Sequence, residues 1–202
     1  MSALNGGVRL WLVRHGETEW SRALRHTGRT DLPLTDHGRA QATALAPRLR
    51  EVPFVAIRCS PLLRARQTLE LALPEAAPTL DDHLQERDYG VAEGRTTTEL
   101  RAEAPGWDSW TVAIDGAETI DQVGARADRA IAQAVAAGES AGGPGDHDVL
   151  LVSHGHLLRV LAARWLGQPA VLGAQLALAV GTVSVLGFER ERRALLRWND
   201  AG

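Results

Sequence analysis

Two short stretches of this sequence repeat each other and decide the fold: LVRHG at residues 12–16 and LVSHG at residues 151–155. Each is an apolar run followed by one polar residue, a histidine and a glycine. Such a run predicts a buried strand, and the glycine allows a sharp turn directly after it. We therefore expect His15 and His154 at the carboxyl ends of two strands, the edge where open α/β sheets bind ligands. If the strands are neighbours, the two imidazoles face each other across one pocket. The alternative is a pair of unrelated histidines at turns.

The rest of the chain alternates apolar runs with helical patterns. Strands are expected at residues 8–13, 54–57, 148–152 and 182–188, and a last strand at 194–198 pairs back through the charged turn 189–193. The Gly-rich residues 138–148 read as a surface loop. Helices between apolar strands predict a mostly parallel sheet covered on both faces. The pattern is that of one α/β domain spanning residues 1–202.

Helix ends are marked by capping residues. Thr35 caps a helix that contains Pro47, which should bend it. Ser60 followed by a proline predicts the start of a helix over residues 62–72. Thr119 and Gln122 form a capping box for a long helix that reaches about residue 137. An apolar stripe over residues 158–165 predicts a helix after the second histidine.

Composition excludes several classes of protein. The 45% hydrophobic and 23% charged residues are those of a globular protein, and a net charge of −3 gives no general attraction to nucleic acid or an anionic membrane. Cys59 is the only cysteine, so no internal disulfide can form and a cytoplasmic location fits. The first seven residues lack the pattern of a signal peptide. The uncharged residues 168–188 contain Pro169 and three glycines, so we expect a short helix and a buried strand there, not a membrane span.

Charged residues near the two histidines have the chemistry of a phosphate site. Arg14 precedes the first histidine, and Arg64 lies in the first turn of the helix that begins near residue 61. A helix N-terminus favours anions, and a guanidinium adds a bidentate donor. Glu86, in an irregular segment, could supply a proton. Taken singly, such an arginine is usually a surface cation and such a glutamate a solvated loop acid.

Five motifs in order give the chain a family resemblance. They are residues 14–18 (RHGET), 27–28 with 34–42 (TG and LTDHGRAQA), 60–68 (SPLLRARQT), Glu86 with 89–90 and 93–94, and 153–155 (SHG). Together they resemble the phosphoglycerate-mutase-like branch of the histidine phosphatase superfamily over nearly the whole chain. The resemblance implies a three-layer α/β/α sandwich and a small phosphorylated substrate. Relatives are commonly dimers, which implies a possible homodimer.

The resemblance also implies catalytic roles. His15 would attack phosphorus and form a phosphohistidine, with its other ring nitrogen held by a backbone carbonyl. A protonated His154, Arg14 and Arg64 would stabilise charge on the phosphoryl oxygens. Glu86 would protonate the leaving group, which predicts higher activity on the acidic side of neutrality. Further phosphate- or substrate-binding positions implied by the family pattern are Ser21, Thr27, Gly28 and Gly155.

Neither a metal nor another cofactor is expected. The seven histidines contain no helical His-Glu-x-x-His, and one cysteine cannot build a thiolate site. His156 is interpreted as a pocket-wall residue. No role follows for His26, Trp107 or Trp110, which could line the pocket mouth but are more typical of a core.

Three functions are compatible with the family pattern. Mutases of this type carry adjacent arginines after the acidic motif and an asparagine after the second His-Gly. Here residues 91–118 contain only Arg95 and Arg101 as basic residues, and His156 replaces the asparagine. This favours a phosphatase acting on small phosphomonoesters, including sugar phosphates and phosphoglycerate derivatives. The alternatives are a cofactor-dependent phosphoglycerate mutase and a catalytically idle binding module, although the full set of five core residues speaks against the latter.

Overall fold

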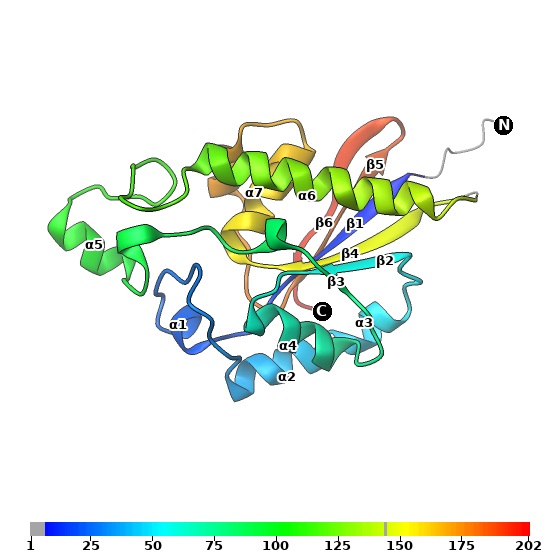
Figure 1. The fold of residues 1–202 in the computed structure, drawn as a ribbon, viewed down its shortest axis with the longest axis horizontal. Helices are drawn as coiled ribbons and strands as arrows, with labels where there is room; N and C mark the ends of the chain where they lie inside the picture. Colours follow the sequence, from blue (N-terminus) through cyan, green and yellow to red (C-terminus); the bar gives the residue numbers. More distant parts are fainter. Residues whose placement is uncertain (1–6, 144) are drawn as a thin grey trace.

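A six-stranded sheet forms the centre of the molecule in a computed structural model that describes residues 7–143 and 145–202 (Figure 1). The strands lie in the order β3-β2-β4-β1-β5-β6. The first four are mutually parallel, and β5 and β6 form an antiparallel hairpin. Their bounds are β1 Val8–Arg14, β2 Ala56–Cys59, β3 Thr79–Leu80, β4 His147–Ser153, β5 Val183–Glu189 and β6 Arg192–Asp200. Because β1 and β4 are adjacent, the two His-Gly turns lie side by side.

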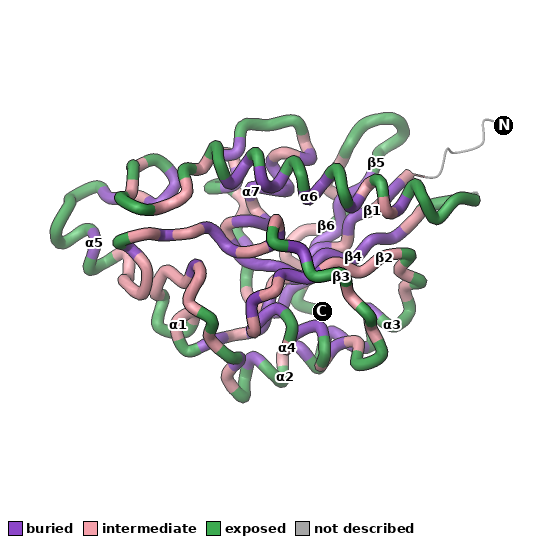
Figure 2. The backbone as a smooth tube through the Cα atoms, viewed as in Figure 1, coloured by how far each residue is buried: buried purple, intermediate pink, exposed green. Residues whose placement is uncertain are grey.

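Helices cover both faces of the sheet, as the alternating strand sequence requires (Figure 1). On β4, Val149 and Leu151 pack in one buried cluster with α6 (Ile120–Ser140) and α7 (Gly155–Trp165). Leu150 and Val152 pack in a second cluster with α3 (Ala46–Arg50) and α4 (Leu63–Ala72), and α2 (Asp36–Ala44) packs on α4. The buried residues concentrate in the sheet between these two helical layers (Figure 2). The predicted three-layer α/β/α architecture is confirmed.

Shorter helical elements connect these strands and helices. They are α1 Glu19–Arg22, α5 Thr97–Glu103 and the 3₁₀ turns η1 Asp82–Leu84, η2 Gly90–Ala92 and η3 Ala170–Gln175. An isolated bridge joins residue 25, which follows α1, to residue 96, which precedes α5. The loops that carry α1 and α5 therefore meet each other beyond the sheet edge.

The structure corrects several expected boundaries. β2 begins at Ala56, two residues later than predicted, and α6 continues to Ser140 into the predicted loop. Pro47 does not bend one helix but stands in the first turn of α3, after α2 has ended. Ser60 is not the N-cap of α4: Leu62 holds that place without a side-chain cap, and the Leu63 amide donates instead to Asp31 at 2.6 Å. The Thr119–Gln122 capping box of α6 is confirmed.

The apolar residues 168–188 form η3 and then β5, as expected. Across the part of the chain that the structure describes, no helix combines the length and apolarity that crossing a membrane requires.

Candidate active site

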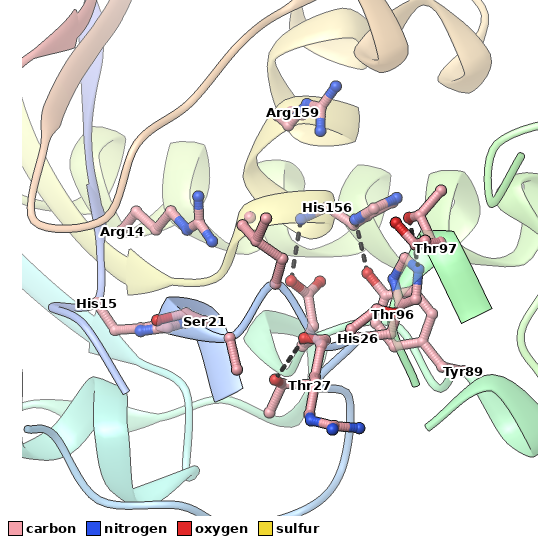
Figure 3. A pocket seen from close by; sticks show the side chains of 16 residues that line it. Arg14, His15, Ser21, His26, Thr27, Tyr89, Thr96, Thr97, His156 and Arg159 are labelled. Atoms are coloured by element: carbon pink, nitrogen blue, oxygen red, sulfur yellow. Dashed lines mark hydrogen bonds between the residues drawn. The ribbon is translucent and has the colours of Figure 1, made fainter. Parts of the chain in front are cut away.

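The register of β1 and β4 brings the two histidines together. Arg14 pairs with Ser153, and the amide of His15 donates to the Ser153 carbonyl at 3.1 Å. The two rings lie 5.1 Å apart between centroids, tilted by 57°. His15 lines a cavity of about 610 Å³, whereas His154 is fully buried beside it and is not among the lining residues (Figure 3). The two rings are therefore neighbours at the same sheet edge, and of the two it is His15 that lines the cavity.

His15 has one nitrogen fixed by the backbone. Its Nδ1 lies 2.7 Å from the carbonyl oxygen of Gly16. A carbonyl only accepts hydrogen bonds, so Nδ1 carries the hydrogen and Nε2 keeps its lone pair. Burial lowers the pKa of His15 well below its ordinary value, and the positive charges of Arg64 and Arg14 lower it further. The ring therefore stays neutral well into the acidic range.

His154 has both nitrogens occupied. The Nε of Arg64 donates to its Nδ1 at 3.1 Å, and its Nε2 lies 2.7 Å from the Ser60 hydroxyl. Because Nδ1 accepts, Nε2 carries the hydrogen, and the ring is neutral. Burial and the neighbouring Arg64 charge lower its pKa well below the ordinary value. His154 is therefore neutral in the free protein, and its protonation with a phosphoryl group bound stays a prediction. Ser60 is a partner that the sequence pattern did not reveal.

Arg64 is completely buried next to His154. Its Nη1 donates to the Thr30 carbonyl at 2.9 Å and its Nη2 to the Gly28 carbonyl at 2.8 Å. The guanidinium is thus held by neutral oxygens, and no carboxylate of the described residues forms an ion pair with it. Its positive charge is left to act on the histidine pair.

Arg14 lines the cavity and has an unsatisfied donor. Its Nη1 donates to the Leu178 carbonyl, but its Nε is buried without a hydrogen-bond partner in the described residues. A buried N–H without an acceptor costs free energy, so this nitrogen favours an anionic oxygen in the cavity. A Cβ on Gly155 would lie 3.1 Å from Arg14 Cζ, so a larger residue there would press on this guanidinium.

Glu86 lines the same cavity and is fixed by backbone amides. Its Oε1 accepts from the amides of Arg87 at 2.8 Å and Leu157 at 3.1 Å. Its Oε2 accepts from the amide of His156 at 3.0 Å. Two of these amides are in the first turn of α7, directly after the second His-Gly motif. One lone pair of Oε2 remains for a group in the cavity.

The substrate-binding positions implied by the family pattern divide into two groups. Ser21 and Thr27 line the cavity. Gly28 is not among the lining residues, since its amide donates to Glu93 at 2.9 Å and its carbonyl accepts from Arg64. Gly28 therefore holds the site together from behind, and a direct contact of its amide with substrate is not available in this arrangement.

The outer cavity contains residues that the sequence analysis did not select. They are Ala23, Leu24, Arg25, Tyr89, the threonines 96–98 and Arg159. Arg159 could have been found from its spacing, because it follows His156 by three residues on α7 and so shares a helix face with it. The threonines gave no such signal, because only the bridge between α1 and α5 places them at the cavity.

Two further histidines form part of the cavity wall. His156 lines it, as expected, with Nδ1 at 2.6 Å from the Tyr89 hydroxyl. Its ring stacks on Trp110 at 4.2 Å between centroids. His26 also lines the cavity and packs on Trp107, with centroids 5.1 Å apart. Both tryptophans are buried behind these histidines and do not line the cavity.

In residues 7–143 and 145–202 no three histidine, cysteine, aspartate or glutamate side chains converge in a way that could hold a metal ion. The groups that converge are a neutral imidazole, an arginine with a free buried donor, and an anchored carboxylate. Together with the α/β sandwich, this set defines the class of the histidine phosphatases.

Comparison with known proteins identifies the family. Residues 10–201 match the histidine phosphatase superfamily (branch 1), so the chain belongs to that superfamily. The family predicted from the five motifs is confirmed, and with it the enzyme class.

Individual relatives differ in their described activities. The chain is 39% identical over 189 residues to an acid phosphatase of Mycobacterium tuberculosis, covering 93% of this chain and 90% of the relative. It is 31% identical over 199 residues to the probable phosphoglycerate mutase GpmB of Salmonella choleraesuis, covering 95% and 90%. A solved mycobacterial glucosyl-3-phosphoglycerate phosphatase in complex with VO3 superposes with a TM-score of 0.83 at 30% identity, covering 95% of this chain and 98% of that one.

Proposed function

We propose that this histidine phosphatase hydrolyses small phosphomonoesters without a metal, through a phosphohistidine on His15. The observation that carries the proposal is the state of His15: Nδ1 is bound to the Gly16 carbonyl, which leaves the Nε2 lone pair of a cavity-lining ring free for attack. A phosphoryl group bound in front of it would meet the unpartnered Nε–H of Arg14.

The reaction takes two steps. In the first, Nε2 of His15 forms a bond to phosphorus as the bond to the ester oxygen breaks, and Glu86 in its protonated form gives its proton to the departing alkoxide. In the second, Glu86 as a carboxylate takes a proton from water, whose oxygen attacks phosphorus and releases the histidine. The buried charges of Arg14 and Arg64 stabilise the phosphoryl oxygens in both steps.

The depressed pKa of His15 makes activity in acid possible. A histidine with an ordinary pKa of about 6.5 would be protonated at pH 5 and could not attack. Here burial and the charges of Arg64 and Arg14 lower the pKa of His15 well below that value, so the ring stays neutral further into the acidic range. This supports hydrolysis on the acidic side of neutrality.

The placement of the arginines supports a phosphatase over a mutase. A mutase must retain a bisphosphate, which needs cations beyond those around His15. The two arginines of residues 91–118 do not line the cavity: Arg95 pairs with Glu103 on the surface, and Arg101 donates to the Trp107 carbonyl. With fewer cations to hold an intermediate, the phosphoryl group passes to water.

One observation favours the mutase as a second candidate. Arg25 and Arg159 line the outer cavity and could contact a second anionic group. However, Arg25 already donates to the Gly94 carbonyl at 2.6 Å and lies 3.7 Å from Glu99, and Arg159 is bonded to the carbonyls of Gly173 and Ala174. Because these contacts already use donors of both arginines, few N–H groups remain to bind a bisphosphate.

Two assays test the proposal. Purified protein treated with a chelator is expected to hydrolyse p-nitrophenyl phosphate at an undiminished rate, and a rate restored only by added metal would overturn the metal-independent scheme. With 3-phosphoglycerate and 2,3-bisphosphoglycerate present, we expect inorganic phosphate and little 2-phosphoglycerate. Rapid isomerisation with little phosphate release would establish the mutase instead.

A further inference from the structure

Leu24 has two unfavourable features at once. Its φ is 55°, in the left-handed region that residues with a Cβ rarely adopt. It is also 79% exposed, so its apolar side chain stands in solvent. Both features cost free energy, so the choice of leucine here calls for a reason beyond packing within the fold.

The end of α1 explains the backbone but not the side chain. The amide of Leu24 donates to the Ser21 carbonyl at 3.2 Å, and the amide of Arg25 donates to the Trp20 carbonyl at 2.9 Å. This pair of bonds is a Schellman motif, in which the residue after the C-cap takes a left-handed conformation and is usually glycine. Glycine or asparagine would fill position 24 with less strain. The turn therefore does not require leucine.

The position of Leu24 supplies the missing reason. Leu24 and Ala23 line the same cavity as His15. Arg25, the next residue, is turned to the Gly94 carbonyl and Glu99, so α1 presents an apolar corner to this part of the cavity. Two other non-glycine residues of the described chain have a positive φ, Arg190 and Asn199, and neither lines the cavity. Strained residues tend to collect at functional sites.

We propose that Leu24 is a specificity-determining residue that packs against an apolar or aromatic face of the substrate's leaving group. The inference rests on the proposed phosphomonoesterase function and names the substrate class: phosphomonoesters whose leaving group has such a face, in preference to short polar alcohols. The cavity of about 610 Å³ is large enough to hold a ring-sized group beside the phosphoryl group. Tyr89 and His26 provide further ring surface in its wall.

The test uses Leu24→Asn, which keeps a side chain of similar size and tolerates the left-handed conformation but removes the apolar surface. Arg190→Asn is the matched control, since Arg190 has the same φ of 55° in the β5–β6 turn away from the cavity. Both variants should melt at or slightly above the temperature of the wild type. The probes are 2-naphthylmethylphosphonate and methylphosphonate, which share the anionic head and are not hydrolysed. Their dissociation constants are measured by calorimetry.

We expect the wild type to bind the naphthyl compound more tightly than the methyl compound. Leu24→Asn should reduce this preference about fivefold, the effect of losing contact with part of one aliphatic side chain. Arg190→Asn should leave it unchanged. A preference that survives Leu24→Asn, an equal loss in both variants, or no binding of either phosphonate would overturn the inference.

Because neither probe is turned over, the two proposals fail separately. A protein that hydrolyses no phosphomonoester but loses its naphthyl preference in Leu24→Asn refutes the proposed reaction and keeps the role of Leu24. A protein that hydrolyses p-nitrophenyl phosphate but shows no effect of Leu24→Asn refutes only the role of Leu24.

Discussion

The turns after β1 and β4 have nearly the same sequence but hold their histidines differently. His15 has one nitrogen bound to its own turn and lines the cavity. His154 is bound on both sides, by Arg64 and Ser60, and is closed off from the cavity. This difference shows that the His-Gly motif determines only where the imidazole lies, at the end of a strand. The chemistry of the ring depends on which neighbours reach its nitrogens, and those neighbours come from α4 and the loop before it.

The largest loss of activity is expected when the free Nε2 of His15 is removed. His15→Asn should lower kcat for p-nitrophenyl phosphate by at least about 10⁴-fold, because removal of a covalent nucleophile leaves only the binding and electrostatic contributions. The exposed His37→Asn on α2 is the control and should retain wild-type turnover. Turnover of His15→Asn within tenfold of the wild type would remove the distinction between the two turns.

Substitution of Glu86 tests the role of the carboxylate that backbone amides after the second His-Gly motif hold in place. Glu86→Gln keeps the shape of the side chain but cannot give a proton, and it should lower kcat by about 10²–10⁴-fold for an alkyl phosphate. The loss should be smaller for p-nitrophenyl phosphate, whose leaving group departs readily without a proton. Equal losses for both substrates, measured by phosphate release, would assign Glu86 a structural role only.

Substitution of the buried His154 should reduce activity less than substitution of the nucleophile His15. His154→Gln should lower kcat/KM by about 10²–10³-fold, because the ring no longer positions the Arg64 guanidinium whose charge stabilises the phosphoryl oxygens. The histidine that carries the phosphoryl group remains. Ser60→Ala, which removes only the hydroxyl at 2.7 Å, should cost less than His154→Gln in the same assay. If Ser60→Ala were as damaging as His15→Asn, the ranking of the two turns would be wrong.

The smallest effect concerns stability. His15, His154 and His156 are buried, and burial lowers the pKa of each well below its ordinary value. Below about pH 6.5 the unfolded chain binds protons at these positions that the folded protein does not. The free energy of unfolding should therefore fall as the pH drops below 6.5, by up to about 1.4 kcal/mol per pH unit for each histidine.

Urea unfolding at pH 7.5 and pH 5.5 measures this slope. His156→Gln should reduce it by one histidine's share, because the variant keeps a polar group opposite Tyr89 without a titrating ring. A stability that rises on acidification would contradict neutral buried imidazoles.

Much of the architecture could be predicted because its signals are local. The apolar runs around β1 and β4, the capping box at Thr119 and the paired His-Gly phrases each depend on residues close in sequence. Ser60 was misassigned because a Ser-Pro pair looks like a helix cap in isolation, whereas its hydroxyl is directed to His154, 94 residues away. The neutral state of His154 and the amide anchors of Glu86 likewise depend on contacts between distant segments.

The central claim is that His15, and not His154, carries the phosphoryl group. The direct measurement is to quench p-nitrophenyl phosphate turnover in alkali, where phosphohistidine survives, using wild type and Glu86→Gln, and to locate the phosphoryl group by peptide mass spectrometry. We predict a phosphorylated peptide containing His15, accumulating more in Glu86→Gln because its hydrolysis is slowed. A phosphoryl group on His154 or on any other residue, or none in either protein during turnover, would contradict the account.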